Sequence, residues 1–340
     1  MQLTASARTE AIIGAWTARP SGQFEKSVEA YKKAYEEIDK QLKKVTDALN
    51  AVSEENRMNE LRKFDRLTKL KKEAKTAYDT AAKINAKNQV LMSKTAMTNK
   101  YYGDLYSVNW FTDDYFKFID QKAVDVSVFG SPEVWENIKA TNAPKYLPYQ
   151  PQSGTLISTL ANNRTKDLVK LNQAITQGLI QCKSYEVVTK DIKKILNTSA
   201  NNARRIARTE GNRNLNSGAF ANLQAATEEG IELKRRYVAT LDLRTRPQSG
   251  SMDGQEVNAD KAFTYPGGVK SFIVGNSGIA RFDINDRCTS IDIIPGSEPQ
   301  LRAGLNPATG EREIASYRTF DTLMKDNNLR QNKAGIIVKS

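Results

Sequence analysis

Three carboxylates in the second half of the chain lie in sequence surroundings that could support acid–base chemistry. Glu210 ends the run Arg-Arg-Ile-Ala-Arg-Thr-Glu, Asp242 begins Asp-Leu-Arg-Thr-Arg, and Asp253 precedes Gly254. Paired carboxylates can carry out acid–base or glycosidic chemistry without histidine, and arginines can hold a phosphate. No Gly-rich phosphate loop of recognised spacing accompanies them, and Asp-Gly is a turn signal by itself. A catalytic role is therefore the weaker of two interpretations, and we expect the protein not to be an enzyme.

The second interpretation is a structural brace made from the same residues. Glu210 follows a helix-like run that contains several arginines, so a salt bridge is its simplest role. We expect Glu210 to pair with Arg244 or Arg246, and Asp242 to pair with an arginine of the helix. Thr245 can hydrogen-bond the backbone of the loop between them. Such a brace would fix a helix against a small sheet, and breaking a buried pair would cost about 3–5 kcal/mol.

The composition excludes several kinds of chemistry. The chain has no histidine, which rules out Ser-His-Asp and Cys-His nucleophile systems and histidine-ligated zinc. Its two cysteines, Cys182 and Cys288, are too few for a cysteine-rich metal site and indicate no disulfide framework. We expect neither a metal nor a cofactor. With no secretion signal and no apolar run of about 20 residues, we expect synthesis in a cytoplasm and no membrane span.

The charge balance favours a polyanionic partner. The net charge is +12, and both residues 1–100 and residues 161–236 carry a net +7. A surplus of this size favours nucleic acid, although lysines on solvated helix faces explain it equally well. The candidate DNA contacts are Lys193, Lys194, Arg204, Arg205, Lys234 and Arg235.

The elements that must position these residues follow from periodicity. Residues 1–100 predict a helical hairpin or bundle, because apolar residues such as Ile38 and Leu42 recur at steps of three and four, with a break near 53–56. Residues 101–155 predict an aromatic junction followed by a proline-rich connector, which cannot be regular helix. The aromatic residues there are expected to fill a core rather than to stack on bases.

From residue 156 the pattern is helical again, and after Gly230 it changes to the period of two that is typical of strands. Further short strands are expected at 272–274, 279–282 and 291–294. We predict a small mixed α/β module over 156–294 and a loosely structured tail over 295–340, with a short helix near 317–324. The fold class is therefore α+β: a long helical N-terminal region, then a helical segment and the small mixed α/β module.

The motif fragments resemble a known family. Together with Asn-Asp-Arg-Cys-Thr-Ser (285–290), the runs at 204–210 and 237–246 and the Met-Asp-Gly turn resemble the phage head morphogenesis family, also called Mu F-like minor head proteins. The resemblance covers about 160–294. The matching residues are Arg204, Arg208, Thr209, Glu210, Asp242, Arg244, Thr245, Arg246, Asp253, Gly254, Arg287 and Cys288.

The sequence also departs from this family. Gln248 or a near neighbour stands where the family usually has a histidine, and Asp286-Arg287-Cys288 stands where it usually has two cysteines. Metal or thiol chemistry that such a constellation could support is therefore not expected here. The retained residues suit a structural brace.

The resemblance implies a minor capsid protein of a tailed phage. Such a protein is made in the host cytoplasm and then lies inside the head near the portal, with portal, capsid and scaffold proteins and nonspecific double-stranded DNA as partners. It would act in head assembly, and in DNA packaging or ejection. The alternatives are a free nonspecific nucleic-acid-binding protein and an enzyme effector such as an ADP-ribosyltransferase.

Overall fold

The computed structural model describes residues 20–62, 65–112, 119–129, 156–181, 183–306, 309, 311–332 and 335–339. These residues divide into two compact units. The helical unit comprises 20–90 and 157–205, and the mixed unit comprises the described residues of 91–156 and 206–340. Two long helices, α4 (Arg66–Thr112) and α8 (Tyr185–Glu228), each contribute residues to both units.

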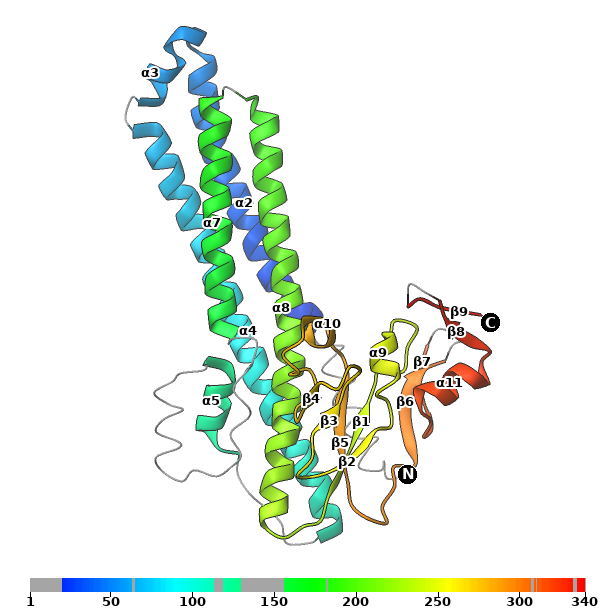
Figure 1. Cartoon of the computed structure of the whole chain (residues 1–340). Coiled ribbons are helices and arrows are strands. Elements are labelled where there is room, and N and C mark those ends of the chain that lie inside the picture. Colours follow the sequence, from blue (N-terminus) through cyan, green and yellow to red (C-terminus); the bar gives the residue numbers. More distant parts are fainter. Residues whose placement is uncertain are drawn as a thin grey trace. The chain divides into compact units, whose positions relative to one another are not determined.

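The helical unit is a bundle of long helices (Figure 1). It contains α2 (Pro20–Asn50), the first part of α4, α7 (Leu156–Ile180) and the first part of α8. The short elements η1 (Glu54–Asn56) and α3 (Arg57–Arg62) follow α2, so the predicted break near 53–56 agrees with the structure. The unit thus takes helices from two separate stretches of the chain, whereas the sequence predicted a bundle within 1–100 alone.

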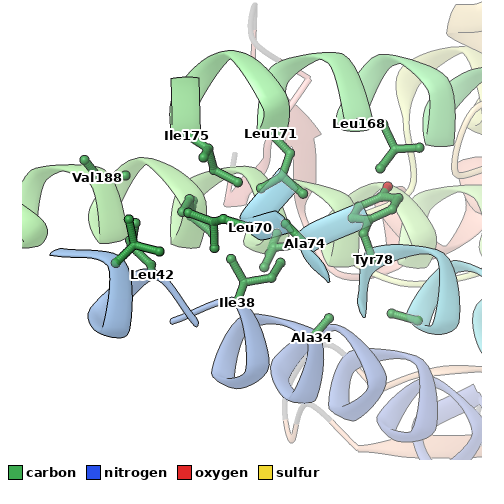
Figure 2. Close-up of a cluster of buried hydrophobic side chains, with 14 of the residues drawn as sticks. Ala34, Ile38, Leu42, Leu70, Ala74, Tyr78, Leu168, Leu171, Ile175 and Val188 are labelled. Carbon is green, nitrogen blue, oxygen red and sulfur yellow. The ribbon is translucent and has the colours of Figure 1, made fainter. Parts of the chain in front are cut away.

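The core of the bundle forms because apolar residues recur every three or four positions and give each helix one apolar stripe. Figure 2 shows Ile38 and Leu42 of α2, Leu70 of α4 and Leu171 of α7 turned toward one another. Burying each such side chain stabilises the fold by about 1.5–3 kcal/mol.

Buried and half-buried polar contacts fix the helices in register. The Asp167 carboxylate of α7 accepts hydrogen bonds from the Tyr78 hydroxyl of α4 at 2.8 Å and from the Ser199 hydroxyl of α8 at 2.6 Å. Asp39 of α2 accepts hydrogen bonds from Tyr185 and Thr189 of α8. A helix that slid by one turn would leave these polar groups without partners, which is unfavourable in a buried site.

The mixed unit contains a three-stranded antiparallel sheet in the order β2-β1-β5. Its strands are β1 (Lys234–Val238), β2 (Glu256–Asn258) and β5 (Thr289–Ile293), and Tyr237 of β1 lies opposite Ser290 of β5. Short elements follow β1 and β2: α9 (Pro247–Gly250), β3 (Phe263–Thr264), β4 (Lys270–Ser271) and α10 (Ala280–Asp283). The α+β fold class is therefore confirmed. The strands expected at 272–274 and 279–282 are wrong, because residues 272–274 form bends and a turn and Ala280–Asp283 form α10.

Helix α8 covers the free edge of this sheet with asparagine side chains. Asn216 Oδ1 accepts hydrogen bonds from the Ser290 backbone N–H and the Thr289 hydroxyl. The Nδ2 groups of Asn212 and Asn216 both donate to the Cys288 carbonyl at 3.0 Å. An uncovered edge strand offers unpaired backbone groups to other chains, and here side-chain amides take the place of a neighbouring strand.

The C-terminal residues correct the prediction of a loosely structured tail over 295–340. They form two antiparallel hairpins, β6 (Leu301–Leu305) with β7 (Arg312–Ser316) and β8 (Leu329–Gln331) with β9 (Ile337–Lys339). Between the hairpins lies α11 (Phe320–Asp326), close to the helix predicted near 317–324. Alternation in these short, half-exposed strands is too weak to be recognised among glycines and prolines.

Most of the predicted junction and connector at 101–155 lies outside the described residues. Residues 101–112 continue α4, and Gln121–Phe129 form α5. Tyr101 is buried in the same cluster as Leu105 and Phe220. None of the described helices combines the length and apolar composition that crossing a membrane requires.

Candidate functional site

The residues of the predicted brace occupy one helix and three loops. Arg204, Arg208, Thr209 and Glu210 lie on α8, where Arg204 and Arg208 are exposed and Glu210 is buried. The other motif residues lie in the loops that follow β1, α9 and α10. Arg204 belongs to the helical unit, and the motif residues from Arg208 onward belong to the mixed unit.

Glu210 pairs within its own helix. Its carboxylate accepts a hydrogen bond from the Arg213 guanidinium three residues along α8, and both side chains are buried. Burial raises the pKa of Glu210, and the charge of Arg213 opposes that rise. The expected pairing with Arg244 or Arg246 is therefore wrong. The i,i+3 spacing on a helix was the sequence signal for the true partner.

Asp242 pairs with Arg287, which is another member of the motif. Two guanidinium nitrogens of Arg287 reach the two carboxylate oxygens, one of them at 2.8 Å. Burial alone would raise the pKa of Asp242, but the hydrogen bonds from Arg287 lower it below its ordinary value. The predicted partner on the helix is therefore wrong. As predicted, Thr245 bonds the loop backbone, because its hydroxyl donates to the Thr240 carbonyl.

Arg246 holds the loop around α10. Its guanidinium donates to the carbonyls of Arg281, Phe282 and Ile284 and to the Asp286 carboxylate at 2.8 Å. Asp286 is buried, which raises its pKa, while Arg246 opposes that rise. Sequence reasoning recognised Arg246 and missed Asp286, which it considered only as the residue standing where the family has a cysteine.

Asp253 binds an arginine from the region predicted to be loose. Its carboxylate accepts hydrogen bonds from Arg302, from the Ala239 N–H and from the Phe320 N–H. Gly254 follows with a φ of +82°, which explains the glycine in the Met-Asp-Gly turn. Arg302 was missed because no feature near residue 302 distinguishes it from a surface arginine.

Cys288 is an inert thiol. It is buried beside Tyr237, Ser249 and Asp286, and burial raises its pKa to about 12. A thiol reacts mainly as its thiolate, so this side chain is a poor nucleophile. Burial also raises the pKa of Tyr237 well above its ordinary value.

The arrangement is suited to holding loops in place. Each of the three carboxylates considered as a catalytic group is bonded to an arginine, and Asp253 also accepts two backbone N–H groups. A general acid or base must reach a substrate proton within hydrogen-bonding distance. Here Asp242 and Asp253 face Arg287 and Arg302, which tie together the loops after β1 and α10 and strand β6, and Glu210 faces Arg213 of its own helix.

The candidate DNA contacts separate into exposed and buried residues. Lys193, Lys194, Arg204 and Arg205 are exposed on α8 in the helical unit, and Lys234 is exposed on β1 in the mixed unit. Arg235 is only 1% exposed and is surrounded by the rings of Phe220, Phe263 and Phe272 at 5.0–5.9 Å. Its guanidinium donates to the carbonyls of Phe272 and Lys261. The prediction that Arg235 contacts DNA is therefore corrected: it is a buried structural residue.

Comparison with known proteins gives two curated relatives and one family. Residues 169–291 match the family described as Phage Mu protein F like protein. The minor head protein GP7 of Bacillus phage SPP1 is 32% identical over 148 residues, which cover 44% of this chain and 48% of that protein. The NAD(+)–arginine ADP-ribosyltransferase EFV of Enterococcus faecalis is 27% identical over 313 residues, which cover 89% of this chain and 57% of the enzyme.

The chain thus spans about half the length of the curated relatives it matches. No solved structure matches it. The family match covers the second half of α7, all of α8 and the loops that carry the brace, as far as β5.

Proposed function

Because residues 169–291 of this chain belong to the family of phage Mu protein F like proteins, we propose that it is a minor head protein of a tailed phage. The observation that carries the proposal is the 32% identity over 148 residues to a phage minor head protein. In this role the chain is made in the host cytoplasm and becomes part of the virion. It acts in head assembly inside the head near the portal, in contact with portal, capsid or scaffold proteins.

Mass spectrometry of purified phage heads tests this role. The chain is expected among the head proteins at a small fraction of the major capsid protein. Its absence from heads that contain every other structural protein would exclude the role. Genomic position is a second check, since a portal gene upstream and scaffold and capsid genes downstream would agree with it.

We also propose nonspecific DNA contact, in packaging or ejection, and we assign it to the helical unit. Residues 20–90 and 157–205 contain 25 Lys and Arg against 15 Asp and Glu, which is +10 of the chain's net +12. The mixed unit is therefore close to neutral. Positive charge that is concentrated in one unit raises the local potential and attracts a polyanion.

Within that unit the best candidate surface is on α7 and α8. Residues 157–205 contain nine basic residues and three acidic ones, and Asp167 among the acidic ones is buried. At 100° per residue, five basic side chains of α8 fall on one exposed face: Lys190, Lys193, Lys194, Arg204 and Arg205. Helix α2 is different, because its six lysines are balanced by six acidic residues.

Two matched sets of four substitutions test the surface. The α8 set replaces Lys190, Lys193, Lys194 and Arg204 by Gln. The α2 set replaces four lysines that are exposed on α2, also by Gln: Lys26, Lys33, Lys40 and Lys43. Both sets lower the net charge by four. Affinity for a duplex is measured at several salt concentrations, and the α8 set is expected to reduce the slope of log K against log salt by about 3–4.

The α2 set should leave that slope almost unchanged. Equal losses in both sets would show that binding depends on total charge and would contradict the assignment to α8. No binding by the unsubstituted protein at ~50 mM salt would remove the DNA part of the proposal.

An enzymatic role is the second candidate, favoured by the 27% identity to an ADP-ribosyltransferase. The alignment leaves the rest of that enzyme unmatched, since it covers 57% of it. Incubating the chain with labelled NAD⁺ and arginine provides the test. Transfer of label to arginine would establish the transferase activity. A head protein that lacks this activity should produce no labelled arginine.

A further inference from the structure

The mixed unit presents exposed apolar side chains on two neighbouring loops. Ile279 and Ile284 flank α10 and are 38% and 41% exposed, and Leu243 in the loop after β1 is 43% exposed. These loops lie together because Arg246 donates to the Ile284 carbonyl and Thr240 donates to the Arg287 carbonyl. We call Leu243, Ile279 and Ile284, with the backbone of 278–285, the α10 knuckle. Figure 1 labels α10.

Two charged side chains, the buried Asp283 and the half-buried Arg246, hold the backbone of the α10 knuckle in place. The Asp283 carboxylate accepts hydrogen bonds from the N–H groups of Ser277 and Gly278 and from the Ser277 hydroxyl, all at 2.8–2.9 Å. Arg246 holds three carbonyls of the same loop. A backbone that is already fixed loses little further conformational freedom when a partner binds, which favours affinity.

The α10 knuckle ends at a residue in the left-handed conformation. Asn285 has a φ of +56°, which asparagine adopts more readily than most other residues with a side chain. Its N–H donates to the Thr209 hydroxyl of α8 at 3.0 Å, which helps to hold that conformation. This contact ties the end of the knuckle backbone to α8.

Arginines adjoin the apolar side chains in sequence. Arg281 is exposed between Ile279 and Ile284, and the Arg244 side chain, which pairs with Asp242, is 80% exposed next to Leu243. Arg208 is exposed on α8 and precedes Thr209, which accepts the Asn285 N–H. Apolar anchors that are rimmed by arginine are typical of protein-binding surfaces. Single-stranded nucleic acid would instead favour exposed aromatic rings, and Phe282, the aromatic residue of this loop, is buried.

We propose that the α10 knuckle is a protein-docking surface, and that its partner presents an apolar pocket rimmed by carboxylates. The motif residues Arg246, Asp242 and Arg287 do not touch the partner. They position the loops that do. This inference rests on the proposed function for its biological setting, because the partner it implies is another protein of the phage head.

A matched pair of variants tests the docking surface in purified heads. The first replaces Leu243, Ile279 and Ile284 by Ser. The control replaces Ile314 and Ile336, also by Ser. These two side chains are 51% and 59% exposed elsewhere in the same unit. Thermal unfolding of both purified variants establishes that they fold. Copies per head, counted against the major capsid protein by mass spectrometry, should fall at least tenfold in the first variant and stay unchanged in the control.

Each outcome decides the inference. Normal incorporation of the folded first variant overturns the docking surface while leaving the proposed function in place. Equal losses in both variants also overturn it. If the first variant keeps its incorporation but loses affinity for a DNA duplex, the surface binds nucleic acid instead. Absence of the unsubstituted chain from heads overturns the proposed function and this inference with it.

Discussion

Asp253 and Arg302 form a buried ion pair in which each side chain is 1% exposed and the Oδ1 and Nη2 atoms are 2.7 Å apart. Arg302 also donates to the carbonyls of Ala239 and Arg318. The pair therefore joins the end of β1, the turn at Gly254, strand β6 and the start of α11. It connects the family motif to the C-terminal hairpins through a buried charge pair.

Replacing Asp253 by Asn should destabilise the protein by about 3–5 kcal/mol, because the buried guanidinium of Arg302 would lose the negative charge of its carboxylate partner. Urea unfolding measures the change. Asp260→Asn is the control, since Asp260 pairs with Lys261 on the surface and its loss should change stability by no more than about 1 kcal/mol. Similar values for the two variants would contradict a structural role for the buried pair.

Asp292 gives the mixed unit a dependence on pH near neutrality. It faces Asp104 and Lys100 of α4, Arg235 of β1 and Asn222 of α8, and burial together with the charge of Asp104 raises its pKa to about 7. Lys100 and Asp104 form a buried ion pair at 2.6 Å. The folded state thus holds a proton on Asp292 that the unfolded chain releases at its ordinary pKa near 4.

This difference in pKa determines whether stability rises or falls with pH. Between about pH 4 and pH 7 the folded state binds more protons than the unfolded state, so the contribution of Asp292 to stability falls as pH rises and is flat above pH 7. Asp292→Asn removes this contribution. As the pH rises from about 4 to 7, the free energy of unfolding of the variant should therefore increase progressively relative to that of the unsubstituted protein. Urea unfolding at pH 5 and pH 8 measures it, with Asp260→Asn as control. A constant difference between the two pH values would contradict the prediction.

Gly218 is required where α8 passes α4 at backbone distance. A Cβ atom at Gly218 would lie 2.2 Å from the Met97 carbonyl oxygen. Alanine elsewhere in a helix stabilises relative to glycine by about 0.5–1 kcal/mol, yet Gly218→Ala should destabilise by about 1–3 kcal/mol because the backbones must separate. Asn201→Ala, at an exposed position of the same helix, should change stability by less than about 0.5 kcal/mol. Thermal unfolding distinguishes the two, and a Gly218→Ala variant of full stability would show that the helices can move apart freely.

The Cys288 thiol should resist chemical modification while the protein is folded. Its pKa of about 12 leaves almost no thiolate at pH 8, and its side chain is buried. A Cys182→Ser variant leaves Cys288 as the single cysteine of the chain. Its reaction with a disulfide reagent should be slow in buffer and immediate in denaturant. Reaction within seconds in buffer would contradict the buried position.

The long helices were predictable because their signal is local. The spacing of Ile38 and Leu42 repeats along α2, and burial follows from that repeat without knowledge of the partner helix. The contribution of 157–205 to the same unit was not predictable, since an apolar stripe does not indicate which other stripe it packs against.

The members of the candidate site were predictable, but most of their pairings were not. Arg287 and Asp242 were both identified by the family resemblance, yet their contact joins residues that are 45 positions apart. The partner of Asp253 lies 49 positions away in a segment without a motif. Charge pairing at such separations depends on tertiary geometry, which neither periodicity nor spacing specifies.

The asparagine side chains of α8 that cover β5 have a consequence for the order of folding. Asn216 and Ser290 are 74 positions apart, so the edge of the sheet is completed only when a distant helix is already formed. Contacts at long separation form slowly because a large loop must close first. Until α8 is in place, the β5 edge is open to pairing with another chain, and this interval is when a newly made copy is most exposed to aggregation.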